Sequence, residues 1–321
     1  KRIEDYVPLI ESQISEQFGN YPLEAFKPFA SYMMRGGKRI RGALTILGYE
    51  MFGGTNSKMI LDAAMAIEML QSYLLIMDDI QDRSETRRGG PTAHVMLSKY
   101  HKENYLKGDA EHFGESIALD SYLVGCHAAF ELISSLDVDP KILIRAIRNI
   151  HKCYVTTAHG QTVDIFSEVV EKVTEDDVNN VLVWKTAFYT FVNPLQFGAI
   201  LAGAEMSDLK MLYDYGIPAG KAFQITDDIL GIYGNEFESG KSPMDDIRDG
   251  KKTILVVKAL ELAGKAEAYY LGQCLGKREL SMGEFKECKK IITTCGAKKY
   301  AEDLAKKYVD EAIGAVAGYK Q

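Results

Sequence analysis

The apolar residues of the chain recur at helical spacing over most of its length. The segment Ser57 to Asp79 is apolar on nearly every side, which predicts a central helix buried all round. Val178 to Phe191 and Lys210 to Leu230 predict two further core helices. Alternation with a period of two, the mark of a half-buried strand, is nearly absent. The pattern therefore predicts an all-α protein.

The composition is that of a globular protein with a sizeable core, since 46% of the 321 residues are hydrophobic and 26% are charged. The net charge of −7 argues against nucleic acid as the main partner. The segment Ala187 to Ala204 is interrupted by Asn193, Pro194 and Gln196, so it predicts a buried, kinked helix and no membrane span. Without a recognisable signal peptide, the sequence predicts a cytoplasmic protein.

The length allows either two domains or one large one, and no Gly/Ser-rich or Pro-rich linker divides the chain. Two polar, glycine-containing loops, Arg83 to Pro91 and Gly231 to Lys252, each follow an apolar helix that ends in aspartates. This recurrence predicts a single domain over residues 1–321, in which two helix ends oppose each other.

The aspartates at these helix ends are the first candidate site. Asp78 and Asp82 lie four residues apart on one helix face, where their carboxylates repel each other unless a cation joins them. Mg²⁺ suits this position because it takes hard oxygen ligands and binds one or two carboxylates together with substrate phosphates. Asp227 and Asp228 repeat the pattern, with Gly231 where a third aspartate could stand.

Basic residues accompany both acidic groups. The segment Arg35 to Gly42 lies at the start of a predicted helix. It contains Gly36 and Gly37, so its backbone can approach an anion closely. Lys38 and Arg41 within it can converge on the same anion. The other cations beside the aspartates are Arg87, Arg88, Lys185, Lys241 and Lys251. This many cations in an acidic chain predict diphosphate binding.

These motifs together resemble the trans-isoprenyl diphosphate synthases, the polyprenyl synthetase family that includes farnesyl and geranylgeranyl diphosphate synthases. The matching stretches are Gly36–Gly42, Asp78–Asp82, Arg87–Gly89, Gly160–Asp164, Lys185–Phe188, Gln224–Gly231, Gly240–Lys241 and Asp246–Lys251. The resemblance implies antiparallel helices around a deep central cavity, in a homodimer. It also implies isopentenyl diphosphate and an allylic diphosphate (dimethylallyl, geranyl or farnesyl) as substrates.

The resemblance assigns a role to each motif residue. The metal site, for three magnesium ions on the allylic diphosphate, would comprise Asp78, Asp82 and Asp227, with Asp79, Asp164, Asp228 and Gln161 around them. The same diphosphate would be bound by Arg87, Lys185 and Lys241, with Lys251 nearby. Isopentenyl diphosphate would be held by Gly37, Lys38, Arg41, Gln71 and Arg88. The developing cation would lie near Thr186 and Gln224.

The implied reaction is a magnesium-dependent head-to-tail (1'-4) condensation. Magnesium ions and basic side chains would neutralise the charge on the allylic diphosphate, so that its C–O bond can ionise. The double bond of isopentenyl diphosphate would then attack the resulting allylic carbocation. Tyr73, about 7.5 Å below Asp78 along the helix, would form the floor of the product tunnel with Leu70 and Leu74. This floor predicts an all-trans C20 product, with C15 as the next choice. A non-catalytic subunit of a heteromeric synthase and a terpene cyclase are the alternatives.

Overall fold

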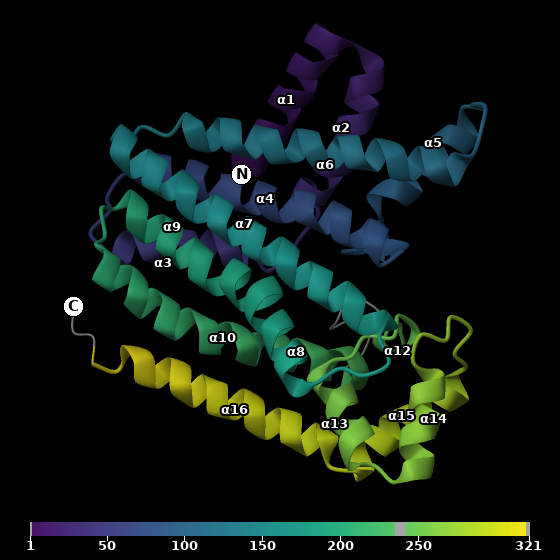
Figure 1. Cartoon of the computed structure of the whole chain (residues 1–321). Helices are drawn as coiled ribbons and strands as arrows, with labels where there is room; N and C mark the ends of the chain where they lie inside the picture. The colour runs from purple at the N-terminus through teal and green to yellow at the C-terminus, as the bar shows by residue number, and fades with distance from the viewer. Residues whose placement is uncertain (1, 235–241, 319–321) are drawn as a thin grey trace. The chain divides into compact units, whose positions relative to one another are not determined.

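The computed structural model, which describes residues 2–234 and 242–318, is built almost entirely of helices (Figure 1). The described residues contain one small sheet, an antiparallel hairpin of β1 (Thr86–Arg87) and β2 (Gly90–Pro91). The predicted all-α class is confirmed, whereas the deep central cavity and the single domain stay predictions. By packing, the chain divides into two compact units: residues 1–147 with 198–203, and residues 148–197 with 204–321.

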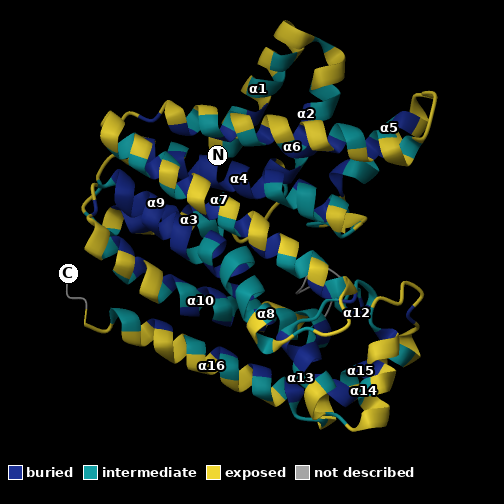
Figure 2. Ribbon diagram, viewed as in Figure 1, coloured by how far each residue is buried: buried dark blue, intermediate teal, exposed yellow. Residues whose placement is uncertain are grey.

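The first unit is organised around one buried helix. Its helices are α1 (Arg2–Phe18), α2 (Asn20–Met34), α3 (Ile40–Met51), α4 (Ser57–Gln81), α5 (Ala93–Glu103) and α6 (Ala110–Ser134). Helix α4 packs against α2, α3 and α6, and residues 63–73 in it are all buried (Figure 2). Asn56 caps its first turn by accepting a hydrogen bond from the Met59 N–H at 3.1 Å. The predicted central helix is thus confirmed and extends to Gln81.

The polar loop after α4 forms the β1–β2 hairpin, which the sequence pattern did not predict. Arg88 and Gly89, the two residues between the strands, both have positive φ angles, of 50° and 72°. Two such residues make the turn whose twist matches that of paired strands. Gly89 adopts this conformation readily, but Arg88 does so at an energetic cost. The hairpin therefore holds two neighbouring arginines in a defined place.

Two helices of the first unit are long and apolar enough to cross a membrane by composition. The apolar window of α4 is 78% buried, as in the core helix of a globular protein. The corresponding window of α6 is only 28% buried, and Leu119, Leu123 and Val124 on it are exposed. Helix α6 thus carries an apolar face that the rest of its own unit does not cover.

The second unit is also helical. Its elements are α7 (Pro140–Val169) and α9 (Asn193–Leu201), which both extend into the first unit's residue ranges, α8 (Glu175–Val181), η1 (Leu182–Val192), α10 (Met206–Tyr233), α12 (Asp245–Arg248), α13 (Ile254–Leu262), α14 (Lys265–Cys274), α15 (Met282–Thr294) and α16 (Ala297–Val316). Helix α10, which contains the predicted Lys210–Leu230 segment, packs against η1 and α16.

The core helix predicted over Val178–Phe191 is present, but not as a single α-helix. The segment begins as the end of α8 and continues as η1, a π-helix of 11 residues. A π-helix carries extra residues per turn, which apolar spacing at 3.6 residues does not reveal, and such segments often accompany functional sites. Helix α9 continues from η1 through Asn193, whose backbone is helical, and Pro194 removes one backbone donor at this junction.

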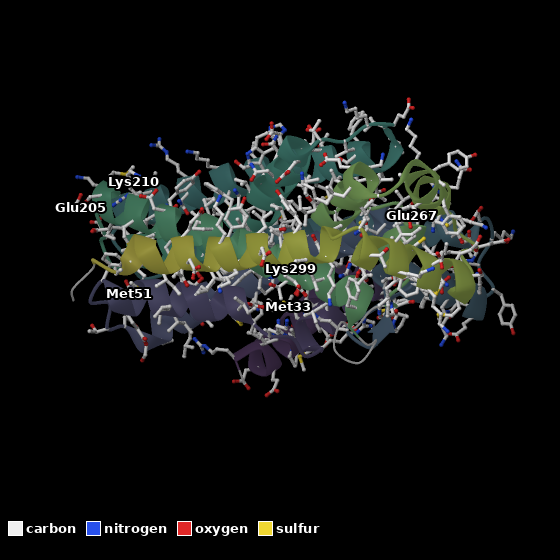
Figure 3. All side chains as sticks on the ribbon, turned by 90° about the horizontal axis from the view of Figure 1, so that it is seen from below. Met33, Met51, Glu205, Lys210, Glu267 and Lys299 are labelled. Atoms are coloured by element: carbon white, nitrogen blue, oxygen red, sulfur yellow. The ribbon has the colours of Figure 1, made fainter. Side chains whose placement is uncertain are left out.

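Helix α16 has one buried face and one charged face. Ala301, Ala305 and Ala312 are buried along one face. Charged side chains occupy the other face, where Lys299, labelled in Figure 3, pairs with Asp303 at 2.6 Å. Such exposed pairs contribute little to stability individually, so the buried face anchors the helix.

Candidate active site

In the first unit, the predicted acidic motif lies at the C-terminal end of α4. Asp78 is partly buried, and its Oδ2 accepts a hydrogen bond from Nη2 of Arg87 at 3.0 Å. Asp82 is the residue that caps α4, one turn further on, and it is also partly buried. The structure therefore places both predicted metal ligands at one helix end, beside the predicted arginine.

Asp79 differs from its neighbours because it is wholly buried. Its Oδ1 accepts a hydrogen bond from Nε of Arg87 at 2.7 Å, and its Oδ2 accepts one from the Tyr32 hydroxyl. Burial raises the pKa of Asp79, and Arg87 and Tyr32 oppose that shift. Burial alone would lower the pKa of Arg87, but Asp79 and Asp78 raise it, so the guanidinium stays charged. Asp79 was predicted to lie at the metal, and the structure gives both its oxygens protein partners.

Basic side chains of the first unit gather around Arg88. Burial and the nearby Arg39 lower its pKa, Glu68 opposes the shift, and Arg87 and Arg41 lower it further. A Cβ on Gly37 would lie 3.2 Å from the Arg88 guanidinium carbon, so the glycine permits this close approach. Cations crowded in this way favour an anion among them. The predicted diphosphate site at Gly37, Arg41 and Arg88 is thus brought together.

The other two residues predicted for this site lie on neighbouring elements. Lys38 is exposed just before α3 begins, and Gln71 is buried on α4, two turns before Asp78.

Glu68 also belongs to this cluster, although it is not among the predicted site residues. It is buried in α4, where it accepts hydrogen bonds from the Gly42 N–H at 2.8 Å and from Arg39 at 3.2 Å. These contacts fix the first turn of α3, which carries Arg41. A carboxylate inside an otherwise apolar helix could have signalled this role, because buried charges need partners.

In the second unit, several predicted site residues contact one another. Nζ of Lys185, on η1, pairs with Asp164 of α7 at 2.5 Å. The Thr186 hydroxyl donates to Oε1 of Gln224 at 2.9 Å, and Nε2 of Gln224 donates to Asp228 at 2.8 Å. The π-helix and α10 therefore carry one continuous chain of polar contacts.

The predicted Gln161 is buried on α7, and Lys251 is partly buried just before α13. Lys241 lies outside the described residues.

The carboxylates of the second unit repel one another. Burial raises the pKa of Asp228 to about 8, and Asp246, Asp164 and Asp227 all act in the same direction. A Cβ on Gly231 would lie 2.6 Å from Oδ2 of Asp246. The space where a third aspartate of the motif could stand is thus next to the carboxylate of Asp246. Asp246 is not among the predicted site residues, although the glycine at 231 was a signal for it.

These oxygen donors fit magnesium. Among the described residues, no three His, Cys, Asp or Glu side chains form a ready-made metal site. Mg²⁺ does not require one, because it binds through one or two carboxylates and takes its remaining ligands from water and substrate phosphates. The mutual repulsion around Asp228 is the physical sign that a cation would be stabilised there.

Below Asp78 on α4, Leu70 and Tyr73 are buried and Leu74 is partly buried. The Tyr73 ring packs edge-on against Tyr122 of α6, with the ring centroids 4.9 Å apart. The predicted floor residue therefore has an aromatic partner from another helix, which the sequence analysis did not foresee.

An all-α chain with aspartates at two helix ends and a separate cluster of guanidinium groups has the features of a metal-dependent enzyme that acts on diphosphate esters. Comparison with known proteins agrees: residues 24–292 match the model of the polyprenyl synthetase family. The chain belongs to this family, so the predicted prenyltransferase class is confirmed.

Individual relatives are similar over most of their length. A geranylgeranyl diphosphate synthase from Sulfolobus acidocaldarius is 34% identical over 288 residues, which cover 88% of this chain and 82% of that protein. A geranylfarnesyl diphosphate synthase from Aeropyrum pernix is 34% identical, with coverages of 86% and 82%. A geranylgeranyl pyrophosphate synthase from Corynebacterium glutamicum, complexed with isoprenyl diphosphate and magnesium, superposes with a TM-score of 0.93 at 29% identity, covering 99% of this chain and 91% of that one.

The raised pKa of Asp228 predicts how stability depends on pH in the magnesium-free protein. The ordinary pKa of an aspartate is 3.8, and that of Asp228 in the folded protein is about 8. Between these two pH values, Asp228 holds a proton in the folded state that it has lost in the unfolded state. Stability therefore falls as pH rises through this range. Asp228→Asn should raise the melting temperature at pH 8 by several degrees and change it little at pH 4, as measured by differential scanning fluorimetry. Asp310→Asn, on the exposed side of α16, is the control. An equal effect of Asp228→Asn at both pH values would contradict the prediction.

Proposed function

We propose that this prenyltransferase joins isopentenyl diphosphate to an allylic diphosphate by magnesium-dependent head-to-tail (1'-4) condensation. The product would be a short-chain all-trans prenyl diphosphate, C20 in preference to C15. The cations crowded around Arg88 carry the proposal, because they would stabilise a second diphosphate besides the one at the aspartates. A condensing enzyme needs such a second site, and a cyclase does not.

The allylic diphosphate is assigned to the aspartates and their neighbouring cations. Asp78, Asp82 and Asp227 would hold three magnesium ions that arrive with it, and Asp164, Asp228 and Asp246 would lie around them. When bound, the metal neutralises charge on the leaving diphosphate. Arg87, Lys185, Lys241 and Lys251 would add positive charge to the same group. The repulsion within the Asp228 group supports this assignment.

Isopentenyl diphosphate is assigned to the cluster of Lys38, Arg41 and Arg88, with Gly37 and Gln71 beside it. Arginine forks match diphosphate oxygens and fix the orientation of the ester, which contributes to the rate by positioning. Thr186 and Gln224, held together at 2.9 Å, would present oxygen atoms to the allylic cation. The proton would leave with the departing diphosphate, so the proposal needs no separate side-chain base.

The central test is product formation from C5, C10 and C15 allylic diphosphates with isopentenyl diphosphate. We expect elongation that ends mainly at C20 and stops when EDTA removes magnesium. Arg88→Gln should raise KM for isopentenyl diphosphate about tenfold or more, since charged hydrogen bonds are lost. Arg278→Gln, at an exposed position, is the control. Hydrocarbon release without isopentenyl diphosphate would indicate a cyclase, and inactivity with every primer would indicate a non-catalytic subunit.

Product length offers a second test. Tyr73 is buried below Asp78 with Tyr122 against its ring, so its side chain would block a growing prenyl tail. Tyr73→Ala should therefore shift the product beyond C20, as read from thin-layer chromatography of the labelled alcohols. Tyr269→Ala, at an exposed tyrosine, should leave the product unchanged. Unaltered product lengths in a folded Tyr73→Ala enzyme would show that this residue is not the floor.

We also propose a cytoplasmic homodimer in which a second copy covers the apolar face of α6. Wild-type protein should then have twice the chain mass of 35.8 kDa in size-exclusion chromatography with light scattering. Leu123→Asp should yield the single-chain mass, because burying an unpaired carboxylate is costly. Val309→Asp, at an exposed apolar position of α16, should keep the double mass. A wild-type protein of single-chain mass would contradict the dimer.

A further inference from the structure

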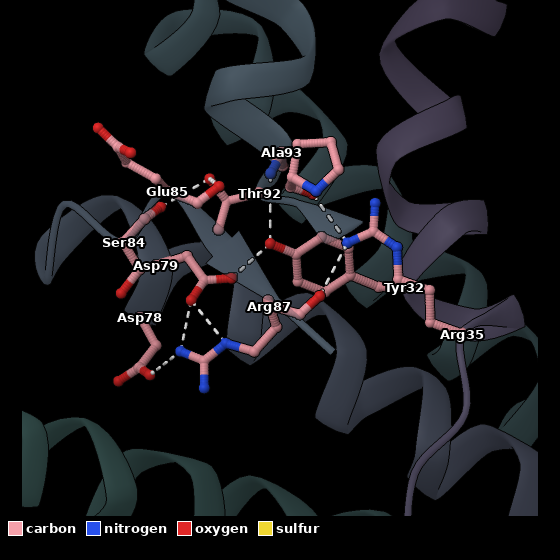
Figure 4. A network of polar contacts seen from close by, with 10 residues as sticks. Tyr32, Arg35, Asp78, Asp79, Ser84, Glu85, Arg87, Thr92 and Ala93 are labelled. Atoms are coloured by element: carbon pink, nitrogen blue, oxygen red, sulfur yellow. Dashed lines mark hydrogen bonds and ion pairs between the residues drawn. The ribbon is translucent and has the colours of Figure 1, made fainter. Parts of the chain in front are cut away.

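Tyr32 is a buried tyrosine at a junction of the first unit. Its side chain, on α2, is fully inaccessible to solvent. The hydroxyl donates a hydrogen bond to Oδ2 of Asp79 and accepts one from the Ala93 N–H at 3.2 Å. The hydroxyl thus links α2 to the end of α4 and the start of α5 (Figure 4). Burial and the adjacent carboxylate raise its pKa, so it remains a donor at neutral pH.

The bond from Tyr32 determines which oxygen of Asp79 faces Arg87. Because Oδ2 is engaged by the hydroxyl, Oδ1 receives Nε of Arg87 at 2.7 Å, and Nη2 pairs with the same oxygen. Nη2 also reaches Asp78 at 3.0 Å. One edge of the guanidinium is therefore bound by carboxylates. Among the described residues, Nη1 has no such partner, which leaves it for a ligand.

The residue that follows α2 holds the backbone of the same arginine. Arg35, one turn after Tyr32, donates to the carbonyl groups of Arg87 at 3.1 Å and Pro91 at 2.8 Å. Its guanidinium carbon lies 5.4 Å from the centre of the Tyr32 ring. The main chain of Arg87 is thus held by Arg35, and its side chain is held through Asp79 by Tyr32.

We propose that Tyr32 is a positioning residue, which orients Arg87 toward the allylic diphosphate through Asp79. In this arrangement Asp79 anchors an arginine and is not a magnesium ligand. The inference rests on the proposed function for the identity of the ligand. The positioning role of Tyr32 itself requires only that Arg87 bind a diphosphate group, whatever that group belongs to.

The first test measures binding of inorganic diphosphate by calorimetry in EDTA, so that no metal contributes. Tyr32→Phe should weaken binding about tenfold, and Asp79→Asn should weaken it at least as much. Tyr49→Phe is the matched control, because the buried Tyr49 hydroxyl also accepts a backbone N–H, that of Asn56 at 3.1 Å, away from Arg87. It should bind diphosphate as the wild type does. Wild-type affinity in a folded Tyr32→Phe protein would overturn the proposal.

A double-mutant cycle separates positioning from a general structural effect. In an Arg87→Ala background, Tyr32→Phe should change diphosphate affinity by less than twofold, since the group that it positions is gone. An additional tenfold loss would show that Tyr32 acts by another route and would overturn the proposal. If Tyr32→Phe does not fold, Asp79→Asn takes its place in the same cycle, with the same criterion.

Magnesium distinguishes the two roles of Asp79. If it anchors Arg87, Asp79→Asn loses affinity in EDTA and with magnesium alike. A loss that appears only with magnesium would mark Asp79 as a metal ligand and contradict the inference. Condensation assays on the wild type test the proposed function separately, since an enzyme that failed them could still show the predicted pattern of diphosphate binding.

Discussion

Negative charge gathered at the ends of apolar helices is the constraint on which the rest of this structure depends. A carboxylate taken out of water is costly unless hydrogen bonds or a cation replace its hydration. Asp79 is wholly buried, and the hairpin that brings Arg87 to it, together with the hydroxyl of Tyr32, supplies that replacement. The same hydroxyl bond joins α2 to the end of α4.

The charged groups of this structure are of two kinds. Some charges are compensated within the protein, as Asp79 is by Arg87 and Glu68 is by Arg39 and the Gly42 N–H. Others are left among like charges, which raises the pKa of Asp228 and lowers that of Arg88. Compensated charges build the fold, whereas crowded like charges mark the places where an ion of opposite sign would be stabilised.

Helical periodicity predicted the long helices that carry these charges and missed two other elements. The apolar segments around α4 and α10 were found at nearly the predicted bounds, because burial on most sides of a long helix leaves a clear pattern. The π-helix η1 was not foreseen, since its apolar residues look like those of an α-helix. The β1–β2 hairpin escaped too, because two-residue strands are too short to show alternation.

Features that depend on neighbours along one helix, or on residue type, can be read from the sequence alone. The four-residue spacing that puts Asp78 and Asp82 on one helix face is such a feature. The order of the family's motifs along the chain is another. Only the tertiary structure decided which partners these residues meet. Tyr32 reaches Asp79 across 47 positions, and Asp246 lies beside Gly231. Such pairs form because packed helices bring remote side chains within hydrogen-bonding distance, and spacing along the chain carries no record of that distance.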